Sequence, residues 1–365
     1  MAVLPPDPLF RFKSDYGHLH TLCFMEPECD AEDKDEIDSK LQKLSVIDGA
    51  VAEQPKKTLL LAAGENGMVY FFDLESNRLI YKQGMGVSIQ AVHTYQEAVI
   101  IQEKQGLVSI FKRSSDLTYE KTTTLPCASG FCKTLRSNHK LIIPQENAAV
   151  DIYDLKTHSQ LQRLQIQSSH GCKDIPTCLH DAINPQQLGQ LMCLEVGMLF
   201  TRTSQLHQDY EELIFAGFET GDVFLWNLTS GVLVAHAKFN ECIISITYDS
   251  IAGKGVVGGA GGVLQVFGVE RSTMTMKPLC ELTLTNEGCQ VVRVRKDRKI
   301  LVCGGFDGRT RIYSWKTLRL LAALTENHAC VTDIQFSEQV VPQWGSQIMA
   351  VSGADGIITI WNLYK

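Results

Sequence analysis

Histidine and cysteine residues, the side chains that most often bind zinc, gather in one stretch of the 365-residue chain. His170, Cys172, Cys178 and His180 fall within residues 170–180. Structural zinc sites usually have cysteine pairs with two to four residues between them, whereas five residues separate Cys172 from Cys178. We therefore expect ordinary loop residues here, and we predict no metal site and no cofactor.

A second candidate for chemistry is the glycine-rich stretch at residues 258–262, because glycine-rich loops can hold phosphate groups. Its spacing differs from Gly-x-Gly-x-x-Gly and no helical pattern follows it, so we interpret it as a turn between strands. The motifs Gly-x-x-x-x-Gly-Lys-Ser/Thr, His-Glu-x-x-His and Gly-x-Ser-x-Gly are absent from the sequence. These observations predict a non-enzymatic protein without catalytic residues.

The elements that position these residues come from an internal repeat. Each copy has an apolar run, a turn that usually contains glycine, and an alternating run that ends in an aromatic residue, as at 59–74, 213–228 and 348–363. The aromatic lies five positions after the turn residue, and this rule finds seven anchors: Phe72, Phe111, Tyr153, Trp226, Phe267, Tyr313 and Trp361. Successive anchors are 39 to 48 residues apart except for one gap of 73, which suits four-stranded blades. The repeat predicts an all-β, seven-bladed β-propeller.

This repeat resembles that of the WD-repeat (WD40) family. In the last copy, His328, Ser352, Asp355 and Trp361 match the family's His–Ser–Asp–Trp hydrogen-bonded set, and residues 17–18 match its Gly-His dipeptide. The resemblance implies one propeller over residues 1–365, closed by an N-terminal strand near residues 8–14 that completes the last blade. Such pairing would remove two exposed sheet edges.

Two segments do not fit the blades. One lies at about 25–57 and the other at about 168–188, with another loop near 201–211. Residues 26–38 contain eight acidic residues and one lysine, so this segment has a net charge of −7, equal to that of the whole chain. We expect a solvated loop there, and a docking or phosphorylation-regulated segment is the alternative.

Binding by propellers usually occurs on one rim, and two aromatic residues stand in turns of that rim. Phe218 and Phe306 occupy positions where a small residue would suffice, so they are either exposed interface anchors or rings folded back onto neighbouring loops. Their neighbours Glu219, Asp307 and Arg309 could contact a charged partner. We predict these five residues as a partner-binding rim.

Composition restricts the classes of function. The acidic excess argues against binding to nucleic acid, and no apolar run is long enough to cross a membrane. The first residues do not resemble a secretion signal, and the twelve scattered cysteines are typical of reduced thiols. We expect the protein in the cytoplasm and the nucleus, monomeric within a larger complex.

Within the WD-repeat family the chain resembles the group of guanine nucleotide-binding protein β-subunit-like protein 1, related to the ASTRA-associated subunit of yeast. The resemblance lies in residues 6–10, 130–132, 213–221, 296–311 and 360–364. It implies a scaffold or adaptor that assists maturation of phosphatidylinositol-3-kinase-related kinases. The implied partners are those large kinases and subunits of a Tel-two-containing co-chaperone, or an ASTRA-type chromatin complex.

Two other functions remain open at this point. A G-protein β-like signalling subunit would need an N-terminal coiled-coil helix for its γ partner, and Pro5, Pro6 and Pro8 disfavour a helix there. Substrate receptors of cullin ubiquitin ligases commonly carry Trp-Asp-x-Arg at the end of a blade. Here the tryptophans Trp226 and Trp361 are followed by Asn-Leu.

Overall fold

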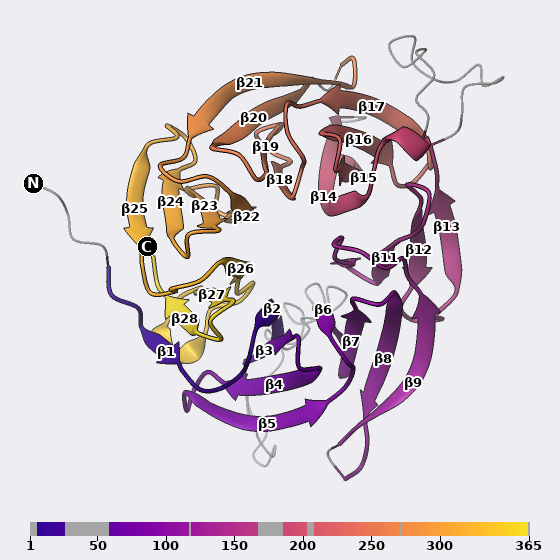
Figure 1. Cartoon of the computed structure of the whole chain (residues 1–365). Helices are drawn as coiled ribbons and strands as arrows, with labels where there is room; N and C mark the ends of the chain where they lie inside the picture. The colour runs from indigo at the N-terminus through magenta and orange to yellow at the C-terminus, as the bar shows by residue number, and fades with distance from the viewer. Residues whose placement is uncertain are drawn as a thin grey trace, which may run out of the picture.

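The computed structural model describes residues 6–25, 58–116, 118–166, 185–202, 208–270 and 272–363. These residues form seven four-stranded antiparallel sheets, arranged as blades around a central channel (Figure 1). The prediction of an all-β, seven-bladed propeller is confirmed. No helix within the described ranges is both long enough and apolar enough to span a bilayer.

In each blade the strands run in order from the channel outwards. Blade 1 contains β2 (Leu19–Met25), β3 (Leu59–Gly64), β4 (Met68–Asp73) and β5 (Arg78–Gly84). Blade 2 contains β6 (Ile89–Tyr95), β7 (Ala98–Glu103), β8 (Leu107–Arg113) and β9 (Tyr119–Pro126). Blade 3 contains β10 (Leu135–Ser137), β11 (Lys140–Pro144), β12 (Val150–Asp154) and β13 (Gln160–Leu164). Blade 4 follows the short 3-10 helix η2 (Pro185–Gln187) and contains β14 (Leu191–Arg202), β15 (Gln208–Phe218), β16 (Asp222–Asn227) and β17 (Leu233–Lys238).

The last three blades repeat this order. Blade 5 contains β18 (Ser245–Asp249), β19 (Lys254–Gly258), β20 (Val263–Glu270) and β21 (Thr275–Thr283). Blade 6 contains β22 (Cys289–Val294), β23 (Ile300–Gly305), β24 (Thr310–Ser314) and β25 (Leu320–Leu324). Blade 7 contains β26 (Val331–Phe336), β27 (Met349–Gly353) and β28 (Ile358–Trp361), with the 3-10 helix η3 (Pro342–Trp344) between β26 and β27.

The N-terminal strand β1 (Phe10–Phe12) completes blade 7 as its outermost strand. It pairs antiparallel with β28, and Phe10 lies opposite Ile360 (Figure 1). The side chain of Phe12 is buried and its ring lies 4.5 Å from that of Phe72 in blade 1. The predicted closure is confirmed, because one short strand covers the edge of the last sheet and also packs against the first blade.

All seven predicted aromatic anchors are buried, and each lies on the third strand of its blade. In blades 1 to 6 the pairing between the third and the outermost strand shifts register immediately before the anchor. A β-bulge increases the local twist of a strand pair. In blades 1 to 6 the repeated aromatic thus lies beside a bulge, where the local twist of the outer strand pair increases.

The predicted insertions fall mostly outside the described residues. These include 26–57 of the first insertion and 167–184 of the second, together with His170, Cys172, Cys178 and His180. The last part of the second insertion is ordered, since η2 is followed by the buried Leu188. The expected loop near 201–211 is wrong in part, because β14 continues to Arg202 and β15 begins at Gln208.

Candidate interaction surface

The ring has two faces with different loops. Because neighbouring strands are antiparallel, the loops after the second and fourth strands of each blade lie at one end, here called the upper face. Loops after the first and third strands lie at the other end, the lower face. The five predicted rim residues stand in the β15–β16 and β23–β24 loops or at their borders, and therefore all belong to the upper face.

Phe218 is the clearest correction to the predicted rim. Its side chain has no exposed surface, and its ring makes an edge contact with Phe224 at 5.5 Å. It lies in the apolar core between blades 3 and 4, because it ends β15 on the face that blade 3 covers. An exposed anchor at this position is excluded. The neighbouring Glu219 is exposed, and its Oε2 accepts a hydrogen bond from the backbone N–H of Gln190.

Phe306 behaves differently, since 39% of its surface is exposed although its ring lies against Gly288. Asp307 accepts two hydrogen bonds from the buried Arg311, at 2.7 and 3.1 Å. Burial alone would raise the pKa of Asp307, but the bonds from Arg311 outweigh it and hold that pKa below its usual range. The side chain of Arg309 is about half exposed. Of the five predicted residues, Glu219, Phe306 and Arg309 therefore offer accessible side chains.

The four residues matched to the WD-repeat hydrogen-bonded set do not form one network in the described structure. Asp355 accepts from the backbone N–H of His328, whose side chain is exposed. Ser352 hydrogen-bonds to Thr332, and the indole of Trp361 donates to Thr359. The expected His–Ser–Asp–Trp chain is replaced by three local contacts.

Other polar contacts, which sequence reasoning missed, do join strands and blades. The indole Nε1 of Trp315 in blade 6 donates to the buried Asp249 of blade 5 at 2.8 Å. Within blade 4, Asp222 accepts from His236 at 2.8 Å and from Lys238 at 2.6 Å. The sequence contains one sign of the Trp315 contact: this tryptophan lies two positions after the anchor Tyr313, where the repeat pattern does not require an aromatic residue.

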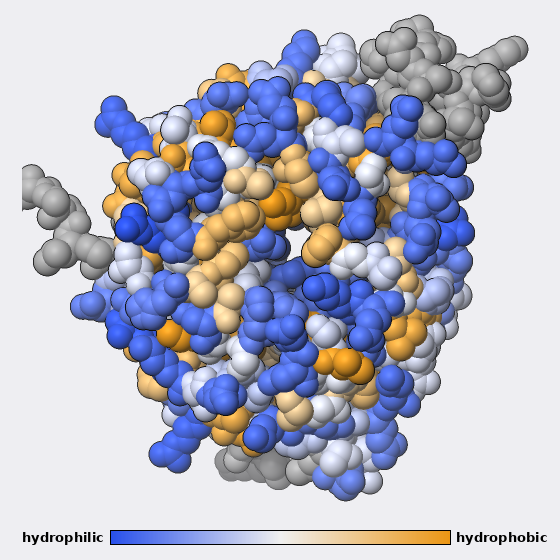
Figure 2. Space-filling model, in the orientation of Figure 1, coloured by the Kyte–Doolittle hydropathy of each residue, from blue (hydrophilic) through white to orange (hydrophobic). Residues whose placement is uncertain are grey.

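The central channel of the ring has a volume of about 850 Å³. It is lined by residues of the innermost strand of every blade, β2, β6, β10, β14, β18, β22 and β26. Figure 2 shows its opening in the middle of one face, bordered by both hydrophilic and hydrophobic residues. A metal site is not formed by the described residues, which contain no suitable group of three or more His, Cys, Asp or Glu side chains.

Side-chain oxygens connect the innermost strands of adjacent blades around this channel. Thr21 Oγ1 accepts from the N–H of Val92, and Ser245 Oγ accepts from the N–H of Val292. Each bond satisfies a strand N–H with a hydroxyl from the preceding blade. These contacts connect blade 1 to blade 2 and blade 5 to blade 6.

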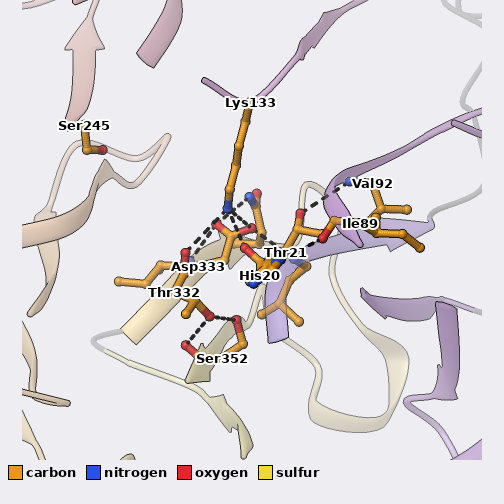
Figure 3. A network of polar contacts seen from close by, with 12 residues as sticks. His20, Thr21, Ile89, Val92, Lys133, Ser245, Thr332, Asp333 and Ser352 are labelled. Carbon is orange, nitrogen blue, oxygen red and sulfur yellow. Dashed lines mark hydrogen bonds and ion pairs between the residues drawn. The ribbon is translucent and has the colours of Figure 1, made fainter. Parts of the chain in front are cut away.

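Lys133 connects three blades that lie far apart in the sequence. It precedes β10 in blade 3, and its ammonium donates to the carbonyl of His20 at 2.6 Å and lies 3.6 Å from Asp333 of blade 7 (Figure 3). The Asp333 side chain is 2% exposed, and its Oδ2 also accepts from the N–H of Leu22 at 2.9 Å. Burial lowers the pKa of Lys133, and the charge of Asp333 partly offsets this effect. One ammonium thus joins blades 1, 3 and 7.

Other ionisable side chains also line the channel, among them His93, Glu195 and Arg293. Burial lowers the pKa of His93 to about 4, so its imidazole is neutral at physiological pH. Burial raises the pKa of Glu195 to about 7, although the charge of Arg293 opposes the shift. The sequence did not indicate that these residues share one channel, because the strands that carry them come together only when the ring closes.

The closed ring and its repeated anchors define a seven-bladed β-propeller, an architecture that is consistent with WD repeats. No family model matches the chain. It is homologous to the guanine nucleotide-binding protein subunit beta-like protein 1 of Mus musculus, with 24% identity covering 99% of this chain and 97% of that protein. It is also similar to the ASTRA-associated protein 1 of two fission yeasts. The identity is 38% over 21% of this chain and 19% of the Schizosaccharomyces pombe protein, and 27% over 44% of this chain and 46% of the Schizosaccharomyces japonicus protein. A WD-type propeller with these relatives supports an adaptor or scaffold role.

Proposed function

We propose that this protein is a non-enzymatic adaptor that assists the maturation or stability of phosphatidylinositol-3-kinase-related kinases. It would act together with a Tel-two-containing co-chaperone or an ASTRA-type chromatin complex. The observation that carries the proposal is the similarity to ASTRA-associated protein 1 within a propeller that also matches a β-subunit-like protein over nearly its whole length. The kinases and the co-chaperone come from the family resemblance.

The accessible upper-face residues supply a surface for such partners. Glu219, Phe306 and Arg309 combine an acidic, an aromatic and a basic side chain on blades 4 and 6. Aromatic and arginine side chains are enriched among the residues that dominate protein interfaces. We propose that these three residues contact the co-chaperone, and that the protein acts as a single copy within the complex.

The test is affinity purification of the tagged protein followed by mass spectrometry. Recovery of co-chaperone subunits and large kinases supports the proposal, whereas a G-protein γ subunit or a cullin adaptor in their place contradicts it. A variant combining Glu219→Ala, Phe306→Ala and Arg309→Ala tests the surface. Phe218 is left unchanged, because truncating a buried ring would destabilise the fold.

The matched control is Val340→Ala, since Val340 is 55% exposed in the β26–β27 loop of the lower face. The triple variant should lose partner recovery while the control keeps it, with equal amounts of folded bait. Equal recovery with both variants would exclude the upper-face assignment and leave the adaptor role untouched.

We further propose that the protein works in both cytoplasm and nucleus. The proposal rests on the sequence alone, in which the scattered spacing of the twelve cysteines is typical of reduced thiols. Imaging of the full chain with a fluorescent tag tests it. A signal confined to one compartment would contradict it.

A further inference from the structure

The outermost strand of blade 6, β25, differs in composition from the outermost strands of the other blades. It lies on the outer side of the ring and consists of leucine and alanine alone (Figure 1). Each of the others, β1, β5, β9, β13, β17 and β21, contains at least one charged side chain. Leu320 is 52% exposed and Leu321 is 43% exposed. Because proteins usually protect sheet edges with charged residues or proline, an apolar edge indicates a strand that receives a partner.

The outer edge of β25 can accept a further strand. Among the described residues β25 pairs with β24 alone, so the backbone N–H and C=O groups of its other edge point away from the sheet. A polypeptide can pair with such groups as an added strand, whereas a lipid headgroup or a nucleic acid cannot form that ladder of hydrogen bonds. The edge therefore favours an extended protein segment.

Basic side chains surround the lower end of this strand. Two loops of blade 6 lie side by side there, because the N–H of Trp315 donates to the carbonyl of Lys299 at 2.9 Å. Arg298 and Lys299 belong to the β22–β23 loop, and Lys316 and Arg319 belong to the β24–β25 loop. These four exposed residues are called the basic patch below. None of them has a carboxylate within ion-pair distance among the described residues.

The two loops carry an excess of positive charge in a chain whose net charge is −7. Residues 295–299 and 315–319 contain six basic residues and one acidic residue, Asp297, which Arg295 holds at 2.8 Å. The carboxylates at the adjoining lower ends of blades 5 and 7 are Asp249, bound by the indole of Trp315, Glu270, bound by Ser272, Glu338, bound by Lys296, and the exposed Asp7. Most of the neighbouring negative charge is therefore already engaged, and the basic patch stays positive.

We propose that β25 and the basic patch form a docking site for an extended acidic segment of a partner protein, with apolar residues among its carboxylates. The backbone of the segment would pair with the outer edge of β25, and its apolar side chains would cover Leu320 and Leu321. Its carboxylates would meet the basic patch, because opposite charges steer and orient such contacts. The site lies on the side and lower end of blade 6, apart from the upper-face surface, and so goes beyond the proposed function.

Charge and backbone geometry together select this occupant. An anionic membrane would satisfy the cations but would leave the strand edge without a partner. A second copy that paired its own β25 would satisfy the edge but would bring no carboxylate to the patch, since β25 contains none. An acidic polypeptide in extended form satisfies both.

Fluorescence anisotropy of a labelled peptide of alternating glutamate and leucine residues, titrated with the full chain, tests the proposal. Lys316→Glu combined with Arg319→Glu should weaken binding by about tenfold or more at low ionic strength, because attractions at two exposed sites become repulsions. The matched control combines Lys82→Glu with Lys112→Glu, which changes the net charge equally at exposed positions of blades 1 and 2. This control should bind the peptide like the unchanged protein.

A second probe tests the strand pairing and needs no variant of the protein. It is the same peptide with N-methyl groups on alternate residues, which lose their backbone donors while every charge is kept. The N-methylated peptide should bind the unchanged protein about tenfold more weakly, because the hydrogen bonds to β25 are lost. Equal affinity for the two peptides would show charge attraction alone and would overturn the pairing with β25.

Other results would also contradict the proposal. Absence of peptide binding to the unchanged protein would overturn it, as would equal weakening by the two double variants. Sedimentation with vesicles containing phosphatidylserine tests the membrane as occupant, and vesicle binding without peptide binding would assign the patch to a lipid surface. Size-exclusion chromatography tests the second copy, and a dimer in place of peptide binding would assign the edge of β25 to self-association.

Discussion

Closure of the ring by β1 makes a quantitative prediction for Phe12→Ala. Phe12 is 4% exposed and contacts the rings of Phe10 at 4.9 Å and Phe72 at 4.5 Å. It belongs to one apolar cluster with Ile358 and Ile360 of blade 7 and with Leu60 and Phe72 of blade 1. Truncating a buried phenylalanine to alanine costs about 3–5 kcal/mol of unfolding free energy.

This cost can be converted into a melting temperature. An unfolding entropy of about 2.1 cal/mol/K per residue gives roughly 0.8 kcal/mol/K for 365 residues. Phe12→Ala should therefore lower Tm by about 4–6 °C, measured by circular dichroism at a fixed scan rate. The fall is small for so large a free-energy change because the entropy of a long chain is large.

The matched control is Leu9→Ala, one position before β1. Leu9 is 39% exposed, and the bond from its backbone N–H to the carbonyl of Ile360 survives the substitution. Its cost should stay below about 1 kcal/mol, or about 1 °C. Equal melting temperatures for the two variants would show that β1 does not fasten the ring, and the closure argument would fail.

Three further perturbations test the loops, the blade contacts and the channel. Gly67→Ala should cost several times more than Gly345→Ala by urea denaturation; both glycines have positive φ, but only at Gly67 would a Cβ meet a backbone oxygen, 1.9 Å away. Trp315→Phe should cost about 1–3 kcal/mol in the same assay, because it leaves the buried Asp249 carboxylate without its indole donor. The unchanged protein should lose unfolding free energy as pH rises from about 5 to about 8, because burial raises the pKa of Glu195 to about 7 in the folded state and its protonated form is lost over this interval. Glu195→Gln has no such group, so its unfolding free energy should rise relative to that of the unchanged protein by on the order of 2–3 kcal/mol over the same interval. Matching urea midpoints within any of these comparisons would contradict the corresponding reasoning.

The repeat made the fold predictable because it records local constraints. An anchor such as Phe72 must be apolar in every blade, and a turn residue such as Gly67 must tolerate positive φ and close approach of the next loop. Both requirements act within about forty residues and leave a periodic trace. The register shift before the anchors of blades 1 to 6 could not be predicted from the sequence, since it concerns the pairing of two strands rather than the type of one residue.

The rim was predictable only in part, and Phe218 and Phe306 show why. Both follow a glycine at the end of the second strand of their blades, so their sequence surroundings are alike. Phe218 still belongs to β15 and packs into the core between blades 3 and 4, whereas Phe306 lies one position beyond β23 and stays partly exposed against Gly288. Whether the strand ends at the phenylalanine or one residue before it thus decides whether the ring is exposed. The ends of strands are the part of a fold that is least reliably predicted from sequence.

The channel could not be predicted because its chemistry is shared among distant segments. Lys133 and Asp333 are 200 positions apart, and nothing in either neighbourhood indicates an ion pair. Arg293 likewise influences the pKa of Glu195 only because blades 4 and 6 both turn their innermost strands to one axis. Strand-to-strand contacts between adjacent blades would survive in an open ring, but contacts across the channel require all seven blades. The properties of the channel therefore depend on closure by β1.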